Sequence, residues 1–345
     1  MLLKNLIKTS SNLNEVQILD LALDSRKVKK GSLFFAIEGS KTTGEKFIKE
    51  ALSKGARAVV CSFKTKIKNK NFPIIKVKDV QKTLGNACRV FFNKKPKNII
   101  AVTGTNGKSS VADFYYQLLF LNKISVASIG TLGVKGKKNI KKATLTSPDI
   151  ISLHKELQKL KKNNIENVII EASSHGLKQG RLNGINFKAG IFTNLSQDHL
   201  DYHKNMNDYF KSKMILFSNL LSKKNYLITD ENIKEFKKLK NISMKRNLNL
   251  ITINKIKNFN LFTNKNLIGK FQFRNLSMSV LAAKISGLKV KNIKKSIKNI
   301  KNVNGRMELC RVLKNKSKIF IDYAHTPDAL KTALISLRVH FNEDV

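Results

Sequence analysis

The stretch "NIIAVTGTNGKSSVADFYYQLLFL" (98–121) constrains the fold most, because an apolar run, a loop with two glycines and an amphipathic run follow one another directly. The common phosphate loop reads G-x-x-x-x-G-K-[ST], and Val102 stands where its first glycine belongs. The other parts remain: glycines that let the backbone approach a phosphate, a helix N-terminus that attracts anions, a lysine and a hydroxyl. We expect an ATP-binding loop in which Lys108 reaches the β- and γ-phosphates and Ser109 ligates Mg²⁺. The alternative is a strand-to-helix turn with incidental glycines.

A series of apolar runs predicts a doubly wound α/β domain around this loop. Strands are expected at 98–102, 167–171, 189–194 and 225–229, and such runs are typical of parallel strands buried on both faces. Asn122 is a candidate cap at the end of the helix that follows the loop. In such sheets ligands bind beyond the C-terminal strand ends, where the polar motifs of this sequence lie. The apolar positions of the helix follow helical spacing: Val111, Phe114, Tyr115, Leu118 and Leu119.

Residues 16–90 carry a second, smaller α/β pattern. The apolar runs "GSLFFAIEG" (31–39) and "ARAVVCS" (56–62) are bounded by turn residues and predict strands. Between them, "EKFIKEALSKG" (45–55) has helical spacing and ends at Gly55, a residue type that commonly follows a helix. A small N-terminal α/β domain is therefore expected.

The net charge is +43, from 66 Lys+Arg against 23 Asp+Glu, and lysine supplies most of the excess. One interpretation is a nucleic-acid or anionic-membrane partner. The other is compositional bias, because lysine, asparagine and isoleucine share A/T-rich codons and are abundant throughout the chain. No patch interleaves arginine with aromatic residues, so the distribution favours compositional bias. We expect no specific nucleic-acid partner.

The cysteines Cys61, Cys88 and Cys310 lie far apart and lack CxxC spacing, which indicates neither a disulfide framework nor a zinc site. The N-terminal residues contain no apolar core of about 7–15 residues, as a signal peptide has. No apolar run approaches the ~18 residues that span a membrane. We expect a soluble, cytoplasmic, monomeric protein with no membrane partner.

Two polar motifs follow predicted strands in the centre of the chain. In "IIEASSHGL" (169–177), Glu171 ends a strand, where a carboxylate suits Mg²⁺. A single strand-end glutamate is more often a surface residue or an ion-pair partner, and a single histidine such as His175 is more often a structural hydrogen-bonding residue. In "NLSQDHLDYH" (194–203), His199 and His203 are four residues apart and share a face if the segment is helical.

This second motif also contains Asp198 and Asp201, which raises the question of a zinc site. Its HxxxH spacing lacks the acid of HExxH, and no third ligand is evident, so the pattern does not favour zinc. Near the C-terminus, "IFIDYAHTPDAL" (319–330) places Asp322 at a predicted strand end, followed by His325 and Pro327.

Together these motifs resemble the Mur ligases of peptidoglycan synthesis, and within that family the ligases that add the third amino acid. "GTNGKSS" is similar to the family's ATP loop, which lacks the first Walker glycine. "EASSHGL", "NLSQDHLDYH", "NGRME" and "DYAHTPDAL" match the third-residue ligases, and "DSRKVKKGSLFFAIEGSKTTGEKFI" (24–48) resembles their UDP-sugar domain. The resemblance implies a small N-terminal α/β UDP-binding domain (1–92), a central doubly wound P-loop ATPase domain (93–309) and the start of a third, Rossmann-like domain (310–345).

The resemblance also implies roles for individual residues. Lys213 of "YFKSKMILF" corresponds to a lysine that is carbamylated in the family (N6-carboxylysine), which turns a cation into an oxygen ligand. The implied catalytic residues are Lys108, Lys213, Glu171 and His199. The implied metal ligands are Ser109, Glu171, His199 and the carbamate of Lys213. The implied ATP-binding residues are Gly104, Thr105, Asn106, Gly107, Lys108, Ser109, Ser110, Asn275, Arg306 and Asp322. The implied substrate contacts are Leu23, Ser25, Ser40, Lys41 and Thr42 for UDP, and Thr146, Ser147, Ser173, Gln179 and Arg181 for the muramoyl peptide.

The implied reaction is ATP-dependent amide formation between UDP-N-acetylmuramoyl-L-alanyl-D-glutamate and a diamino acid, diaminopimelate or lysine, through an acyl phosphate. With ATP and Mg²⁺ as cofactors, catalysis rests mostly on positioning and charge neutralisation. Family members have a third domain that binds the incoming amino acid, whereas this sequence stops at Val345. We therefore expect a fragment with impaired turnover, whose last helix exposes its apolar face.

Two alternatives stay open. The first is a ligase similar to folylpolyglutamate synthase, which predicts no UDP-sugar unit at the N-terminus. The second is a catalytically inactive remnant that binds a nucleotide or a nucleic acid.

Overall fold

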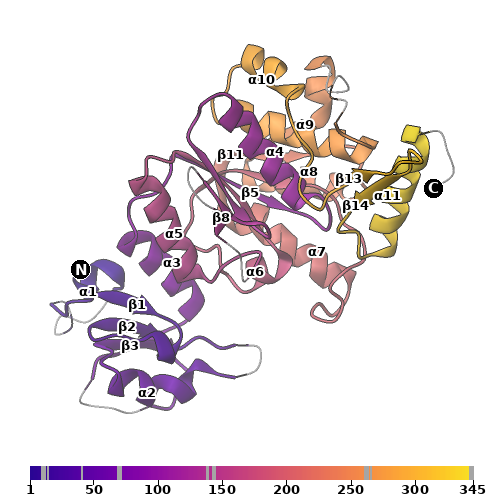
Figure 1. The fold of residues 1–345 in the computed structure, drawn as a ribbon. Coiled ribbons are helices and arrows are strands. Elements are labelled where there is room, and N and C mark those ends of the chain that lie inside the picture. The colour runs from indigo at the N-terminus through magenta and orange to yellow at the C-terminus, as the bar shows by residue number, and fades with distance from the viewer. Residues whose placement is uncertain are drawn as a thin grey trace. The chain divides into compact units, whose positions relative to one another are not determined.

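The structure is a computed structural model that describes residues 1–8, 13, 15–39, 42–67, 72–136, 140–141, 145–259, 264 and 266–341. The chain divides into two compact units (Figure 1). Unit 1 comprises Met1–Lys95, Asp149–Lys162 and Gly180–Ile185, and unit 2 comprises Pro96–Pro148, Asn163–Gln179 and Asn186–Val345. Within the described ranges, no helix has both the length and the apolar character needed to cross a bilayer.

Unit 1 is built on a four-stranded sheet, in which all neighbouring strands are parallel and follow the order β1-β2-β3-β4. Its elements are α1 (Leu3–Leu6), β1 (Asp20–Ala22), the 3₁₀ helix η2 (Ser25–Lys27), β2 (Ser32–Phe35), the 3₁₀ helix η3 (Gly44–Phe47), α2 (Ile48–Ser53), β3 (Ala58–Ser62), β4 (Ile74–Val77), α3 (Val80–Phe91) and α5 (Ile150–Lys162).

The central strands of this sheet are buried on both faces, which explains their continuous apolar runs. In β2, Leu33 and Phe35 join a core with residues of α1 and α3, while Phe34 joins a second core with residues of α2. Gly55 follows α2 with a φ of 92°, so the predicted helix end is confirmed.

Helix α5 and the turn at 180–185 belong to unit 1, although the strands before and after them belong to unit 2. Ile150 of α5 joins the core formed by α1 and α3. His154 of α5 is fully buried, and its Nε2 lies 2.8 Å from the carbonyl oxygen of Asn183. Neither segment is part of the N-terminal domain that we expected from the sequence, because their attachment depends on contacts between distant residues.

Unit 2 is built on an eight-stranded sheet in the order β12-β11-β10-β5-β9-β6-β7-β8. The six strands from β12 to β6 are parallel, and β7 and β8 add an antiparallel edge. The strands of the sheet are β5 (Asn98–Thr103), β6 (Val126–Gly130), β7 (Gly133–Lys135), β8 (Ile140–Lys141), β9 (Asn167–Glu171), β10 (Phe187–Phe192), β11 (Leu221–Thr229) and β12 (Asn249–Thr252). The remaining elements are α4 (Lys108–Leu121), α6 (Ser174–Lys178), α7 (Met206–Ile215), the π-helix η4 (Leu216–Leu220), α8 (Phe236–Arg246), the 3₁₀ segment η5 (Ile253–Phe259), α9 (Lys270–Ile285), α10 (Val290–Ile297), β13 (Glu308–Val312), β14 (Lys318–Ile321) and α11 (Pro327–Phe341).

Helices α4 and α9 pack side by side against the centre of this sheet (Figure 1). All five predicted apolar positions of α4 are buried in this core, together with Leu276 and Val280 of α9 and Ile169 of β9. Asn122 caps the end of α4, because its Nδ2 donates to the carbonyl oxygen of Leu118 at 2.7 Å. The predicted helix and its cap are therefore confirmed.

The C-terminal elements form a smaller assembly within unit 2, in which α11 packs on the antiparallel hairpin of β13 and β14 (Figure 1). Ala333 of α11 is buried, and Phe320 of β14 packs against the same small core. The opposite side of α11 stays exposed, as expected from the sequence: Leu330, Ile335 and Val339 are 53%, 50% and 74% exposed.

The α/β class with mainly parallel sheets is confirmed. The four strands predicted for the central domain correspond to β5, β9, β10 and β11, and the two predicted near the N-terminus correspond to β2 and β3. Strands β6, β7, β8 and β12 were not predicted from the sequence. Cys61 and Cys88 are buried as free thiols, and Cys310 is exposed and free.

Candidate active site

The ATP-type loop lies between β5, which ends at Thr103, and α4, which begins at Lys108. Gly104 and Gly107 have φ angles of 148° and 86°, which residues with a side chain rarely adopt. A Cβ added to Gly104 would lie 1.9 Å from Thr193 Oγ1, and one added to Gly107 would lie 2.6 Å from Asn275 Oδ1. Both positions therefore require glycine, so the loop is not a turn with incidental glycines.

The segment after β10 holds the loop from one side. Asn194 Oδ1 accepts a hydrogen bond from the amide of Asn106 at 2.9 Å, and Thr193 Oγ1 donates to the carbonyl of Asn106 at 2.6 Å. Thr105 Oγ1 accepts from the amide of Ser196 at 3.0 Å. Thr193, Asn194 and Ser196 were not predicted as site residues, although their position directly after a predicted strand was the available signal.

Lys108 folds back over the loop. Its Nζ donates to the carbonyl oxygens of Gly104 at 3.0 Å and Thr105 at 2.7 Å. Burial lowers the pKa of the Lys108 ammonium, and the carboxylates of Glu171 and Asp198 oppose that shift. The lysine is therefore held at the mouth of the phosphate loop with no ion-pair partner in direct contact among the described residues.

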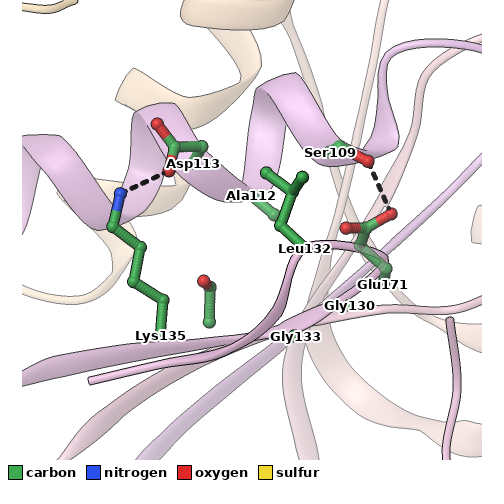
Figure 2. A pocket seen from close by; sticks show the side chains of 9 residues that line it. Ser109, Ala112, Asp113, Gly130, Leu132, Gly133, Lys135 and Glu171 are labelled. Atoms are coloured by element: carbon green, nitrogen blue, oxygen red, sulfur yellow. Dashed lines mark hydrogen bonds and ion pairs between the residues drawn. The ribbon is translucent and has the colours of Figure 1, made fainter. Parts of the chain in front are cut away.

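Glu171 ends β9 next to the first turn of α4, where its buried carboxylate faces Ser109 (Figure 2). Ser109 Oγ donates to Glu171 Oε2 at 2.9 Å. The amide of Thr131 donates to Oε1 at 3.0 Å, and the Thr131 hydroxyl donates to Oε2 at 3.2 Å. Burial raises the pKa of the Glu171 carboxyl, while Lys108 and these donors lower it. Thr131 was not predicted as a site residue, because nothing in its local sequence points to a distant carboxylate.

Lys213 of α7 approaches the same loop from another direction. It is only 1% exposed, and its Nζ donates to the carbonyl oxygen of Gly104 at 2.8 Å. The Nζ lies 4.1 Å above the centre of the Tyr209 ring, whose hydroxyl donates to Thr105 Oγ1 at 3.2 Å. Burial, assisted by the nearby Lys108 charge, holds the pKa of Lys213 well below its usual value. Burial of this kind disfavours the charged form of a lysine.

His199 and His203 do not lie on one helical face. His199 has a φ of 53° in an irregular turn, and His203 is buried, with Nε2 3.0 Å from Ser174 Oγ. His199 Nε2 lies 3.4 Å from Asp198 Oδ2, and burial lowers the pKa of this imidazole. The His199 ring lies 6.1 Å from the Tyr209 ring, which Lys213 Nζ also faces.

The residues predicted near the nucleotide at the C-terminal end also reach the loop. Arg306 Nη2 donates to Ser109 Oγ at 3.3 Å, and the guanidinium stacks 4.4 Å from the Tyr323 ring centre. Asp322 Oδ2 accepts from the amide of Met307 at 2.7 Å, which ties β14 to the segment that carries Arg306. Asn275 of α9 is buried directly against Gly107.

Four of the residues predicted to hold the muramoyl peptide gather around the end of β9. Ser147 Oγ donates to the carbonyl oxygen of Glu171 at 2.9 Å and lies 3.2 Å from Ser173 Oγ. Thr146 Oγ1 lies 3.2 Å from Thr131 Oγ1. Gln179, one helix further on, donates to the Tyr202 hydroxyl at 3.1 Å. The fifth, Arg181, lies in the turn that belongs to unit 1.

The residues predicted to contact UDP lie in unit 1. Ser25 is buried and donates to Glu50 Oε2 at 2.7 Å. Leu23 packs against the core that includes α3. Thr42 accepts a backbone hydrogen bond from Gly39 at 2.9 Å. Ser40 and Lys41 lie outside the described residues.

The donor set at the loop suits Mg²⁺ better than zinc. A buried carboxylate and a serine hydroxyl 2.9 Å apart are hard oxygen ligands at the first turn of a helix. Within the described part of the chain, no group of three or more His, Cys, Asp and Glu side chains is arranged to hold a metal ion. The closeness of two lysines, the buried Lys213 and the half-buried Lys108, which both donate to the Gly104 carbonyl oxygen, also fits a site for phosphate groups.

The fold and this site define a nucleotide-dependent enzyme of the P-loop α/β class. The Mur ligase middle domain matches residues 102–304, and the Mur ligase family catalytic domain matches residues 18–92. A UDP-N-acetylmuramoyl-L-alanyl-D-glutamate–2,6-diaminopimelate ligase of Rickettsia montanensis is 40% identical over 347 residues, covering 93% of this chain and 71% of that relative. The chain therefore belongs to the Mur ligase family, whose members are ATP-dependent ligases.

Solved structures agree with this assignment. A UDP-N-acetylmuramoyl-L-alanyl-D-glutamate–2,6-diaminopimelate ligase structure superimposes with a TM-score of 0.81 at 26% identity, covering 98% of this chain and 74% of that one. Mycobacterium tuberculosis folylpolyglutamate synthase complexed with ADP reaches a TM-score of 0.59 at 13% identity and covers 75% of this chain. This second likeness shows a shared fold alone. The match at residues 18–92 favours the Mur ligases over the folylpolyglutamate synthase alternative.

Proposed function

We propose that the chain is an ATP-dependent ligase that joins diaminopimelate to UDP-N-acetylmuramoyl-L-alanyl-D-glutamate in peptidoglycan precursor synthesis. The observation that carries the proposal is the convergence of Lys108, Ser109, Glu171 and Lys213 on one phosphate-type loop. In a chain of this family, such a loop serves to activate a carboxylate by phosphoryl transfer. The 40%-identical relative of Rickettsia montanensis is named as a diaminopimelate ligase, which supports diaminopimelate, rather than lysine, as the amino acid.

The loop from Gly104 to Ser110 binds the phosphates of ATP in this proposal. The α4 N-terminus and the loop amides supply donors, and Lys108 exchanges its two carbonyl contacts for phosphate oxygens. Arg306, which contacts Ser109, adds a second cation, and Asn275 and Asp322 lie with it on the nucleotide side. These cations offset the charge that develops on the transferred phosphoryl group.

Ser109, Glu171, His199 and carbamylated Lys213 hold Mg²⁺ in this proposal. The ion supplies charge neutralisation for the phosphates. Lys213 supports the carbamate because its amine is buried, has a lowered pKa and donates to a neutral carbonyl oxygen. The neutral amine attacks CO₂, the C–N bond forms as one C–O π bond opens onto oxygen, and an N–H proton passes to solvent water, which leaves an anionic carbamate. The anion would then compensate the excess of positive charge around Lys108.

The chain's own residues account for the steps on the substrate. Thr146, Ser147, Ser173, Gln179 and Arg181 hold the peptide end, and the D-glutamate side-chain carboxylate is held against the γ-phosphate. Its oxygen attacks phosphorus, the bond to the ADP oxygen breaks, and an acyl phosphate forms. The amine of diaminopimelate then displaces phosphate to give the amide. No protein nucleophile takes part, so the residues act by positioning and electrostatics.

In this proposal, each of the three domains inferred from the sequence binds a different substrate. Residues 1–92 bind the UDP end, through Leu23, Ser25, Ser40, Lys41 and Thr42, and residues 93–309 bind ATP. Residues 310–345 begin the part that receives the amino acid. The exposed apolar side of α11 is compatible with such a beginning.

The half-reaction offers the most direct test, because it requires only ATP and the UDP-sugar dipeptide. The chain is incubated with ATP, Mg²⁺, UDP-N-acetylmuramoyl-L-alanyl-D-glutamate and neutral hydroxylamine, which traps an acyl phosphate as a hydroxamate. We expect one hydroxamate and one phosphate per ADP formed, detected by mass spectrometry and a phosphate assay. Adding diaminopimelate or lysine in separate reactions then identifies the amino acid.

The control is Lys108→Met, which keeps the length of the side chain and removes its charge. Loss of hydroxamate in this variant, with unchanged circular dichroism, ties the reaction to the loop. If wild-type chain binds neither ATP–Mg²⁺ nor the UDP-sugar dipeptide by calorimetric titration, the proposed function is wrong and the inactive-remnant alternative gains support.

A further inference from the structure

Thr131 sits in the two-residue turn of the β6–β7 hairpin and makes two contacts to Glu171. Its amide donates to Oε1 at 3.0 Å and its hydroxyl donates to Oε2 at 3.2 Å. The hairpin register pairs Gly130 with Gly133, so Thr131 and Leu132 form the turn. Thr131 thus donates a hydrogen bond to each carboxylate oxygen of Glu171, and Ser109 donates one to Oε2.

The hairpin lies so close to Glu171 that its backbone leaves no space for a side chain. A Cβ added to Gly130 would lie 2.1 Å from Glu171 Oε1 and 2.4 Å from its carboxyl carbon. The carboxylate is 2% exposed, so its rotation is limited by the hairpin on one side and by α4 on the other. The hairpin position therefore decides the Glu171 orientation.

An ion pair attaches the base of the hairpin to the helix that carries Ser109 (Figure 2). Lys135 Nζ, on β7, lies 2.7 Å from Asp113 Oδ1, on α4. Asp113 is four residues after Ser109, so both side chains project from the same face of α4. Gln117 Nε2 donates to the other Asp113 oxygen at 2.6 Å, and the Lys135 ammonium lies 4.4 Å above the Tyr116 ring.

The hairpin and α4 are thus connected at two places. Ser109 of α4 and Thr131 of the hairpin both donate to the Glu171 carboxylate, and the Asp113–Lys135 ion pair joins α4 to β7. Ser109, Asp113 and Lys135 also line a small pocket beside Glu171, together with Gly130 and Leu132 on either side of Thr131 in the chain (Figure 2). Thr131 also lies 3.2 Å from Thr146 through their hydroxyl groups, which brings the hairpin turn to the predicted peptide-binding residues.

We propose that Thr131, held by the Lys135–Asp113 ion pair, is a positioning residue for the Glu171 carboxylate and sets how tightly the site takes a divalent cation. This inference rests on the proposed role of Glu171 as a metal ligand. Groups that orient a ligating carboxylate commonly change metal affinity by about 10–100-fold when they are removed. Thr131 acts through Glu171 and is not a catalytic residue.

A substitution of Lys135 distinguishes positioning of the Glu171 carboxylate from a direct electrostatic effect on the cation. Removing a positive charge near a cation site strengthens cation binding if only Coulomb interactions act. If Lys135 works by holding the hairpin, its loss lets Thr131 move away from Glu171 and weakens cation binding. The two explanations therefore predict opposite signs for Lys135→Met.

The experiment measures Mn²⁺ binding to the complex with ADP by electron paramagnetic resonance, which does not depend on turnover. We expect Thr131→Val to weaken Mn²⁺ binding about tenfold, because it keeps the shape but removes the hydroxyl. Thr131→Ser retains the hydroxyl and restores binding to near the wild-type value. Lys135→Met weakens Mn²⁺ binding in the same direction as Thr131→Val.

Matched controls separate this role from general destabilisation. Thr83→Val removes a helical hydroxyl that donates to the Asp79 carbonyl in unit 1, and Lys245→Met removes an exposed charge from α8. Both leave Mn²⁺ binding unchanged. Affinity for metal-free ADP and the circular dichroism spectrum report whether each variant is folded.

Glu171→Gln distinguishes failure of this inference from failure of the proposed function. If Glu171→Gln weakens Mn²⁺ binding but Thr131→Val does not, or if Lys135→Met strengthens it, Thr131 has no positioning role and the ligase proposal is unaffected. If Glu171→Gln itself leaves Mn²⁺ binding unchanged, the metal role of Glu171 is wrong, and the inference about Thr131 is wrong with it.

Discussion

The Lys213 ammonium nitrogen lies 2.8 Å from the Gly104 carbonyl oxygen, across 109 residues of the chain. This contact places a buried amine at the first residue of the phosphate loop, beside a second lysine whose charge disfavours protonation of the first. The carbonyl oxygen accepts a hydrogen bond from Lys213 but carries no full negative charge, so burial and the Lys108 charge, rather than this contact, hold the pKa of Lys213 low.

Lys213→Arg abolishes hydroxamate formation, because a guanidinium stays protonated and cannot form a carbamate. Wild-type chain supplied with ¹³C-labelled bicarbonate gives a carbamate carbon signal by NMR, and Lys213→Arg gives none. Lys211→Arg, on an exposed position two residues earlier on α7, is the matched control and keeps the signal. An absent signal in wild type at saturating CO₂ contradicts the carbamate.

Gly104→Ala removes ATP binding and lowers the free energy of unfolding by about 1–3 kcal/mol. The added Cβ meets Thr193 Oγ1 at 1.9 Å, and the φ of 148° is unfavourable for alanine. Calorimetric titration measures the loss of binding, and urea unfolding measures the loss of stability. Gly136→Ala is the control: among the described residues its Cβ meets Ala127 Cβ alone, at 4.0 Å, so stability changes by less than about 0.5 kcal/mol. Normal ATP affinity in Gly104→Ala contradicts the assigned loop.

Because folding disfavours protonation of His154, the free energy of unfolding of unit 1 decreases as the pH falls from 6.5 to 4. Burial, with the Lys95 charge, lowers the pKa of this imidazole to about 4, from an ordinary value of 6.5. The unfolded chain binds a proton in this range while the folded chain does not, so stability rises with pH and is lost as pH falls. His154 contributes a loss of about 2 kcal/mol between pH 7 and pH 5.

The His154 prediction is checked by urea unfolding of wild type and His154→Gln at both pH values, followed by circular dichroism. Carboxylates contribute equally to both proteins, so the difference isolates the histidine. His154→Gln shows a smaller loss of stability on acidification. An identical loss in the two proteins means that His154 is protonated in the folded chain.

The net charge of +43 produces weak, non-specific binding to nucleic acid. Because phosphate neutralisation releases counterions, affinity for a fluorescent DNA duplex falls by about 10³-fold or more between 50 mM and 200 mM salt. Fluorescence anisotropy with two unrelated duplexes measures the affinity and its sequence dependence. Nanomolar binding of one duplex at 200 mM salt contradicts compositional bias and supports a nucleic-acid partner.

Local patterns predicted the phosphate loop well because its determinants are neighbours in the chain. The strand before it, the helix after it and the cap at Asn122 follow from spacing within a few turns, and the structure confirms all three. Contacts between residues that are distant in the chain could not be predicted in the same way. The turn at 180–185 joins unit 1 partly through Asn183 and Gly184, which pack tightly against Gly85. A Cβ added to Gly85 would lie 2.6 Å from Asn183 Cβ.

The histidine motif shows the limit of periodicity. Four-residue spacing placed His199 and His203 on one face only if the segment was helical, and the φ of 53° at His199 shows that it is not. Irregular backbone after a strand is stabilised by contacts to distant elements, such as the hydrogen bond between His203 and Ser174. Spacing alone carries no information about such contacts.

The sequence by itself determined the strand–loop–helix unit, the parallel α/β class and the adjacent pair Lys108 and Ser109, because hydrophobic period and glycine conformation act over a few residues. Only the tertiary structure decided which distant groups complete the site. Parallel strands bring their C-terminal ends to one edge of the sheet, so Glu171 meets Ser109 across 62 residues and Arg306 meets it across 197. The orientation of Glu171 depends in addition on Thr131, whose place is set by packing of a hairpin against α4 rather than by any local pattern.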